Sequence, residues 1–192
     1  ANPFLVRALD PFRNKVSGQE VTFRVINGNG NFDGASQSAV TTDANGEARV
    51  SFKLGTIAGD SVYVVHAIAT REDKPSEELI NSPIVFKASA LPKAAEKIVV
   101  VDSTNEQSGE VGLPLLHPIT AKVTDEFGNG INDHAVTFDI QGQGGLLVDG
   151  TGESTRKVVL TNADGLASVV WRMPSTPGNV YAQASAVGAD TS

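Results

Sequence analysis

Acidic and amide side chains in turn-like segments are the residues best suited to chemistry, because Ca²⁺ prefers their hard oxygen atoms as ligands. Residues 43–47, Asp-Ala-Asn-Gly-Glu, resemble the start of a helix-loop-helix calcium loop. The later Glu ligand and the flanking helices are missing, and Asx-Gly pairs are also what turns use. We therefore expect no metal-binding residues, with a structural Ca²⁺ near the connector between the chain halves as the alternative. The candidate ligands are Asp10, Asn14, Asp43, Asn45, Asp102, Asp125, Asn129 and Asp164.

Other catalytic and cofactor-binding patterns are missing from the sequence. His66, His117 and His134 lie far apart, without the spacing of a metal site. There is no Cys, and no Ser lies in a Gly-x-Ser-x-Gly motif. Gly-rich residues 28–30 and 142–145 precede neither Lys-Ser/Thr nor a helical pattern, so we expect bends or bulges there. We predict no catalytic residues, no cofactor-binding residues and no enzyme activity.

Carbohydrate binding normally needs exposed aromatic rings, and aromatic residues are only 6% of this chain. Trp171 falls on the apolar side of an alternating segment, so we expect it in a core. Tyr63 and Tyr181 are the rings that we expect to be exposed.

Length, charge and hydropathy narrow the class of protein further. The chain has 192 residues and a net charge of −7, with no basic block that could follow a phosphate backbone. No apolar run approaches the roughly 20 residues of a membrane-spanning helix, and the N-terminal residues lack a signal-peptide pattern. We expect a folded chain that neither binds nucleic acid nor inserts into a membrane.

An internal repeat is the main organising signal. Asp-x-Phe-x-Asn followed by Val-Thr-Phe occurs from residue 10 and again from residue 125, and Thr-Asx-Ala-Asx-Gly-x-Ala occurs from residues 42 and 161. Gly59 and Gly178 each precede a Val-Tyr pair, and Phe52 corresponds to Trp171. The two halves are therefore copies of one module.

Apolar residues alternate with polar ones inside each copy, which predicts strands with one buried face. The inward residues are predicted to be Val21, Phe23, Val25, Ala48, Val50, Phe52 and Leu54 in the first copy, and Val136, Phe138, Ile140, Ala167, Val169, Trp171 and Met173 in the second. Residues 62–69 are apolar throughout and leave two registers open. Either Val64, His66 and Ile68 point inward, or Tyr63, Val65 and Ala67 do. Residues 43–46 and 162–165 are predicted to be tight hairpin turns.

The resulting architecture is all-β: two tandem immunoglobulin-like β-sandwich modules. We expect one module at residues 1–90, a linker at 91–96 and a second module at 97–192. Residues 98–101 form a strand that the first copy lacks, and the strand at 84–87 has no counterpart before the chain ends. Each module is therefore expected to lack one edge strand, and an open sheet edge can accept a strand from another chain.

These motifs and their order resemble the bacterial immunoglobulin-like repeats of the invasin and intimin type, and the resemblance covers nearly the whole chain. Residues 119–125, Ile-Thr-Ala-Lys-Val-Thr-Asp, are particularly similar to the family's second strand. The resemblance implies a stalk or adhesive array of a bacterial cell-surface or secreted repeat protein, with adjacent modules of the same chain as partners. It favours a spacer; the alternative is a module that recognises a glycan or protein through the loops at one end of the sandwich.

Overall fold

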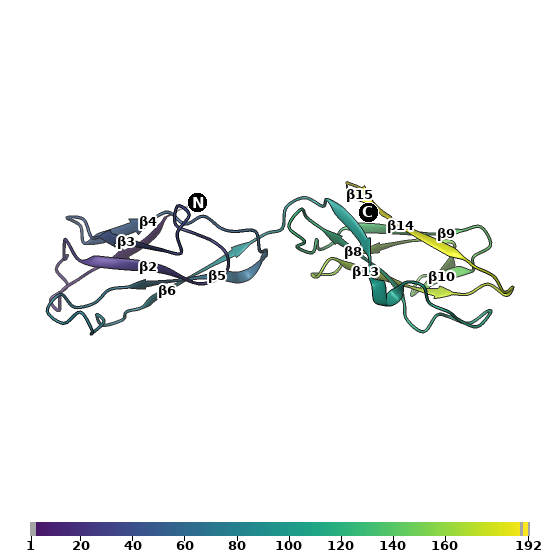
Figure 1. Cartoon of the computed structure of the whole chain (residues 1–192), viewed down its shortest axis with the longest axis horizontal. Coiled ribbons are helices and arrows are strands. Elements are labelled where there is room, and N and C mark those ends of the chain that lie inside the picture. Colours follow the sequence, from purple (N-terminus) through teal and green to yellow (C-terminus); the bar gives the residue numbers. More distant parts are fainter. Residues whose placement is uncertain (1–2, 189, 192) are drawn as a thin grey trace. The chain divides into compact units, whose positions relative to one another are not determined.

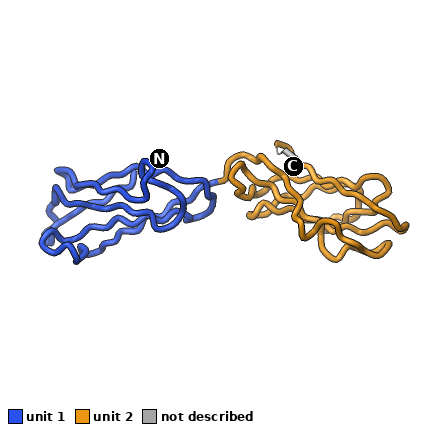
Figure 2. Tube along the Cα trace, in the orientation of Figure 1, with its two compact units in different colours: residues 1–91 blue, residues 92–192 orange. Residues whose placement is uncertain are grey.

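The protein forms two compact units in the computed structural model, which describes residues 3–188, 190 and 191. Unit 1 comprises residues 1–91 and unit 2 residues 92–192 (Figure 2). Both units are β-sandwiches of the immunoglobulin-like class, in which two sheets enclose one apolar core. Within the described residues the helical structure is a single 3₁₀ turn, η1 (Asp102–Thr104).

Unit 1 has a two-stranded sheet in the order β1-β4 and a four-stranded sheet in the order β3-β2-β5-β6 (Figure 1). All its strand pairs are antiparallel. Apolar side chains at every second residue face the core between the sheets, as the pleat of a strand requires. Its strands are β1 (Phe4–Arg7), β2 (Glu20–Asn27), β3 (Gln37–Thr41), β4 (Glu47–Val50), β5 (Gly59–Ile68) and β6 (Ile84–Ala90).

Unit 2 repeats this plan, with one sheet in the order β11-β10-β13-β8-β7-β15 and another in the order β12-β9-β14. The short β15 runs parallel to β7, whereas the other pairs are antiparallel. Its strands are β7 (Lys97–Val100), β8 (Ile119–Thr124), β9 (Ala135–Gln141), β10 (Leu146–Asp149), β11 (Gly152–Ser154), β12 (Arg156–Leu160), β13 (Leu166–Arg172), β14 (Tyr181–Ala186) and β15 (Asp190–Thr191).

The predicted core positions are confirmed in most strands. Phe23 and Phe138 are 0% and 2% exposed, and each belongs to its unit's core cluster. Burying an aromatic side chain of this size contributes about 2–3 kcal/mol to folding. Leu54 is an exception: β4 ends at Val50, and Leu54 lies beyond it with 38% exposure.

The register of β5 settles the alternative that the apolar run left open. Tyr63, Val65 and Ala67 are buried, so these three residues face the core. The repeat offset between Val62 and Val180 pointed to the other register. It failed because Val65 pairs with Val25 while Ala182 pairs with Ile140, which makes Tyr63, and not Val62, the counterpart of Val180.

The two Asx-Gly turns are not hairpins between paired strands, although their backbone conformation is as predicted. Gly46 and Gly165 have φ of 71° and 78°, the left-handed conformation that favours glycine. Each turn, however, joins strands of opposite sheets: β3 pairs with β2 while β4 pairs with β1. The turn chemistry is the same in both arrangements, so the residues do not reveal which sheet the chain enters next.

Within the described residues, β1 and β14 each have fewer strand partners than their counterparts in the other unit. β1 pairs with β4 alone and β14 pairs with β9 alone. Their counterparts in the other unit, β8 and β5, each have partners on both sides: β8 lies between β13 and β7, and β5 lies between β2 and β6. Each module thus lacks a strand pairing at one sheet edge that its copy has.

Candidate functional site

The repeated Asp-x-Phe-x-Asn segments form turns held by their own aspartate. In unit 1, Asp10 Oδ1 accepts hydrogen bonds from the backbone N–H groups of Phe12 at 2.9 Å and Asn14 at 2.7 Å. Asp10 Oδ2 accepts one from Asn14 Nδ2 at 2.8 Å. These bonds satisfy backbone groups that the turn would otherwise leave unpaired, as Asx turns do.

Asp125 makes the same turn in unit 2 and is far more deeply buried, with 1% exposure. Its Oδ1 accepts from the backbone N–H groups of Phe127 and Asn129, both at 2.9 Å. Its Oδ2 accepts from Asn129 Nδ2 at 2.9 Å and from the Lys93 backbone N–H at 3.0 Å. The Lys93 bond ties the chain before β7 to this turn.

Electrostatics at Asp125 combine two opposing effects. Burial raises the pKa of the carboxyl group, but the hydrogen bonds from Asn129, Lys93 and Phe127 outweigh burial, and the net pKa is lowered. For Asp10 the bonds from Asn14 dominate, and its pKa is lowered too. Both side chains are therefore charged at neutral pH and serve as acceptors for backbone donors.

The second pair of repeated turns is built in the same way. Asp43 Oδ1 accepts from the backbone N–H groups of Asn45 at 2.7 Å and Glu47 at 3.0 Å. Asn162 Oδ1 accepts from Asp164 at 2.9 Å and Leu166 at 3.0 Å. In unit 1 this turn lies beside the first one, because Lys15 Nζ donates to Asn45 Oδ1 at 3.2 Å.

The candidate calcium ligands do not converge. In the part of the chain that the structure describes, no three His, Asp or Glu side chains gather closely enough to hold a metal ion. Asp10 lies with Asn14, Asp125 with Asn129, and Asp43 with Asn45, each pair inside its own turn. Asp102 begins η1 and uses its backbone carbonyl to accept from Asn105 at 3.1 Å. A bound Ca²⁺ stays an untested alternative.

The three histidines occupy separate places. His66 lies in β5, half-buried, and His117 is exposed in the loop before β8. His134 lies just before β9, where its Nε2 is 3.0 Å from the Val187 carbonyl oxygen. This spacing matches the expectation of ordinary strand and surface positions.

The aromatic predictions hold for two of three rings. Trp171 is 8% exposed and donates from Nε1 to the Gly144 carbonyl oxygen at 2.8 Å, while Tyr181 is 69% exposed. Tyr63 was expected to be exposed, but it is 1% exposed. The register of β5 turns it inward, where its hydroxyl donates to the Ile57 carbonyl oxygen at 2.9 Å and accepts from the Ile57 N–H at 3.1 Å. A buried Tyr keeps its polar end paired in this way.

The Gly-rich segments are bends, as expected. Gly28 has φ of 87°, and a Cβ there would approach the Tyr63 ring to 2.5 Å. Residues 142–145 form a turn in which Gly142 and Gly145 have φ of 64° and 95°. Gly28 therefore makes room for the Tyr63 ring, and Gly145 makes room for the backbone at Arg172 and Met173.

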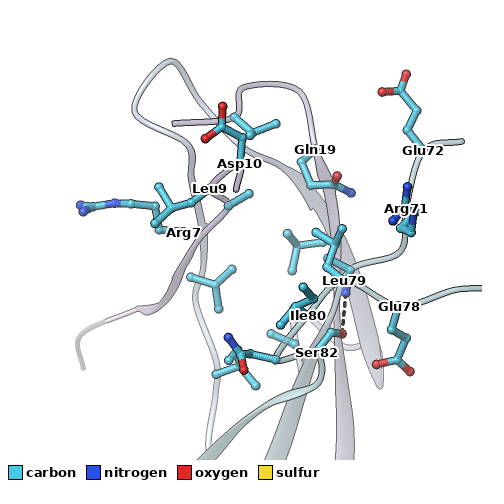
Figure 3. Close-up of a pocket in the computed structure, with 18 of the residues that line it drawn as sticks. Arg7, Leu9, Asp10, Gln19, Arg71, Glu72, Glu78, Leu79, Ile80 and Ser82 are labelled. Atoms are coloured by element: carbon cyan, nitrogen blue, oxygen red, sulfur yellow. Dashed lines mark hydrogen bonds between the residues drawn. The ribbon is translucent and has the colours of Figure 1, made fainter. Parts of the chain in front are cut away.

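A mostly apolar cavity of about 690 Å³ lies beside β1 in unit 1, and sequence reasoning did not identify it. Figure 3 shows Leu9 on one side of it and Leu79 and Ile80 on the other. Charged side chains, among them Arg71, Glu72 and Glu78, also line it. The signal that could have found it is the strand that the first copy lacks, because a missing edge strand leaves a gap between the sheets.

Comparisons with known proteins returned structural matches only. No protein-family model matches the sequence, and no curated relative matches it. The chain is similar to the crystal structure of invasin, a bacterial integrin-binding protein, with 20% identity and a TM-score of 0.37 over 96% of this chain and 32% of that one. It is also similar to the Yersinia pseudotuberculosis adhesin InvE, with 17% identity and a TM-score of 0.38 over 95% of this chain and 49% of that one.

A Parabacteroides merdae β-glucuronidase is similar at 17% identity and a TM-score of 0.36, over 90% of this chain and 20% of that one. The chain spans less than half of each of these three proteins. Among the described residues, no helix has the length and apolar character needed to span a bilayer.

Proposed function

We propose that the two units are non-catalytic spacer modules of a bacterial cell-surface or secreted repeat protein with a role in adhesion. The observation that carries this proposal is that the polar residues shared by the two copies hold the turns of the fold. Asp10 and Asp125, and likewise Asp43 and Asn162, use their side-chain oxygens to hold the backbone of their own turns. The repeat therefore preserves the parts that build a β-sandwich.

The buried polar residues of the repeat have the same building role. Thr42 and Thr161 are 4% and 2% exposed. Thr42 Oγ1 donates to the Val16 carbonyl oxygen at 2.7 Å and accepts from the Gln19 N–H at 3.0 Å. Thr161 Oγ1 donates to the Ile131 carbonyl oxygen and accepts from the His134 N–H at 2.8 Å. Paired polar groups of this kind stabilise a fold without offering a reactive atom to a substrate.

The resemblance of these motifs to invasin- and intimin-type repeats supports the surface location and the link with adhesion. Folded modules in series suit a spacer, because each compact unit has its own apolar core. The four-stranded sheet of unit 1 and the six-stranded sheet of unit 2 supply the backbone hydrogen bonds that such a role needs.

Force spectroscopy on the whole chain tests the spacer role. We expect two separate unfolding events, each lengthening the chain by roughly 300 Å at about 3.4 Å per residue. A panel of glycans and matrix proteins is titrated in parallel. Saturable binding that substitutions in the loops at one sandwich end abolish would replace the spacer with a ligand-binding module. A single unfolding event, or unfolding at negligible force, would also contradict it.

A further inference from the structure

The predicted linker is attached to unit 2 at three points. The Lys93 backbone N–H donates to Asp125 Oδ2 at 3.0 Å, and the Glu96 N–H donates to the Thr124 carbonyl oxygen at 2.9 Å. Between these two bonds, Ala95 packs against the core cluster of unit 2. Most of the linker is therefore held by unit 2 before β7 begins.

The Lys93 side chain lies over the same Asp turn. Its Nζ is 2.5 Å from Glu126 Oε1 and 4.8 Å from the centre of the Phe127 ring, a distance at which a cation and an aromatic ring attract each other. The Lys93 and Glu126 side chains are 63% and 42% exposed, whereas Asp125 is 1% exposed. Water screens the exposed ion pair, so we expect the backbone bond to Asp125 to contribute more.

The bond from Lys93 is not needed to build the Asp turn. In unit 1, Asp10 holds the same turn with the bonds from Phe12 and Asn14. Asp125 makes the equivalent bonds, and its Oδ2 accepts the Lys93 N–H in addition. The carboxylate of Asp125 therefore has a second role, which is to hold the chain that precedes β7.

Two residues, Leu91 and Pro92, separate this attached segment from unit 1. Strand β6 ends at Ala90, which is still paired with Gly59. Among the described residues, neither Leu91 nor Pro92 makes a hydrogen bond. The ring of a proline fixes its own φ at about −65°, and the residue before a proline is restricted to extended conformations. Few backbone rotations are therefore left between the paired end of unit 1 and Lys93.

We propose that Asp125 fixes the linker to unit 2 through Lys93, so that the flexible joint of the chain is Leu91 and Pro92 alone. Without this bond, the backbone rotations of residues 93–95 would add to those of the joint, and the two units would reorient more freely. Asp125 is thus a positioning residue that sets the length of the joint. This inference does not depend on the spacer role, because ligand-binding modules in series would have the same joint.

Amide hydrogen exchange in the full chain tests the bond. We expect the Lys93 amide to exchange far more slowly than the Leu91 amide, because it donates to a buried carboxylate. Asp125→Asn replaces one carboxylate oxygen by an NH₂ group, which cannot accept a hydrogen bond. The remaining oxygen can still hold the turn. We expect the Lys93 amide of this variant to exchange at least about 10-fold faster, with the amides of β9 unchanged.

Two further variants serve as controls. Asp10→Asn makes the same substitution in the same turn of unit 1, and we expect it to leave exchange at Lys93 unchanged. Lys93→Ala keeps the backbone N–H but removes the side-chain contacts with Glu126 and Phe127. We expect it to accelerate exchange at residue 93 by less than Asp125→Asn does.

Distances between two spin labels test the joint itself. The chain has no Cys, so Gln37→Cys in β3 and Gln183→Cys in β14 place one label at an exposed position of each unit. We expect Asp125→Asn to broaden the distribution of label-to-label distances, and Asp10→Asn to leave its width unchanged. Trp171 fluorescence verifies that unit 2 of each variant is folded.

Three outcomes would overturn the proposal. The first is fast exchange of the Lys93 amide in the unaltered chain, a measurement that decides alone if Asp125→Asn does not fold. The second is a distance distribution that folded Asp125→Asn leaves unchanged, or that Asp10→Asn broadens equally. The third is a larger effect of Lys93→Ala than of Asp125→Asn, which would show that the Lys93 side chain, and not Asp125, holds the linker.

Discussion

Unit 1 and unit 2 differ at one edge of the sandwich, the edge formed by β1 in unit 1 and by β8 in unit 2. In unit 2, β7 covers the edge of β8 and Ile98 closes the core; in unit 1, the matching edge of β1 borders a cavity. The reverse holds on the opposite sheet. There β6 covers β5 in unit 1, whereas in unit 2 one edge of β14 is covered by no described strand and lies beside a cavity of about 830 Å³. Two copies of one module therefore show both the filled and the open form of each edge.

The comparison also separates what the motif residues do from what the edge strands add. The Asp turn is equally well formed in both units, although Asp10 lacks the bond that Asp125 receives from Lys93. The turn therefore forms without β7, whereas closure of the core next to it requires a strand at that edge.

The largest effect is expected at Ile98. Ile98→Ala removes the side chain that closes the unit 2 core, and a buried Ile→Ala substitution costs about 2–5 kcal/mol of unfolding free energy. Trp171 is the chain's one tryptophan, so its fluorescence during urea unfolding follows unit 2 alone.

Val100→Ala is the matched control, because Val100 is in the same strand and 51% exposed. Its expected change is within about 0.5 kcal/mol. Equal losses from the two substitutions would show that Ile98 does not close the core.

The next largest effect is expected at Asp125. Asp125→Ala leaves several buried N–H groups without their charged acceptor, which costs about 1.5–3 kcal/mol. Asp10→Ala, the matched substitution in unit 1, is expected to cost less, because Asp10 is more exposed and lacks the Lys93 bond. The free energies of unfolding of both variants, with amide exchange to assign the unit, check this order; a larger loss at Asp10 would reverse the comparison.

Acid should weaken unit 2 through the same carboxylate. The pKa of Asp125 is lowered on folding, so the folded chain binds its proton less readily than the unfolded chain does. The stabilisation is complete above the unfolded pKa, near pH 4, and is lost as the pH falls through the folded pKa. We expect the Asp125→Asn variant to lose less stability than the parent chain between pH 5 and about pH 2, as measured by Trp171 fluorescence. Identical slopes would contradict the assignment.

Much of the fold could be predicted from the sequence, because alternation and turn chemistry are local. Phe23, Phe138 and Trp171 were placed in the core from periodicity alone, and Gly46 and Gly165 were placed in turns from Asx-Gly chemistry. The direction of the chain after each turn was not predictable, since it depends on which sheet the next strand joins.

Tyr63 shows the limit of periodicity. Residues 62–68 of β5 are apolar apart from His66, so alternation alone does not identify the buried face. The pairing of β5 with β2 decides it, and the Tyr63 hydroxyl finds a partner in the Ile57 carbonyl oxygen. The strand that the first copy lacks indicates a gap beside β1, but not the residues that line it. Its walls come from segments as far apart as Val6 and Leu79, and only the tertiary fold brings them together.

A smaller effect is expected at Tyr63, where the units differ in their core. Tyr63→Phe keeps the ring but removes the hydroxyl that binds both backbone groups of Ile57, which costs about 0.5–1.5 kcal/mol. The loss should appear as faster amide exchange in unit 1, with the Trp171 transition of unit 2 unchanged. Weaker Trp171 stability instead would mean that the units do not unfold independently.

The smallest expected effect is a difference in strength between two ion pairs, one in each unit. In unit 2, Lys157 Nζ lies 2.7 Å from Asp149 Oδ1, and hydrogen bonds from Lys157 and Thr151 lower the pKa of Asp149 to about 2. In unit 1, Arg71 lowers the pKa of Asp73. The Lys157 side chain is 10% exposed and that of Arg71 is 48% exposed, so solvent screens the Arg71 pair more strongly.

NMR titration of the two carboxyl groups tests this difference. We expect Lys157→Met to raise the pKa of Asp149 from about 2 toward its ordinary value, and Arg71→Met to raise that of Asp73 by less. Because both pKa values are lowered on folding, each pair stabilises the chain above about pH 4 and stops doing so as the pH falls through the folded pKa. An equal rise at the two aspartates would show that burial of the lysine does not set the strength of the pair.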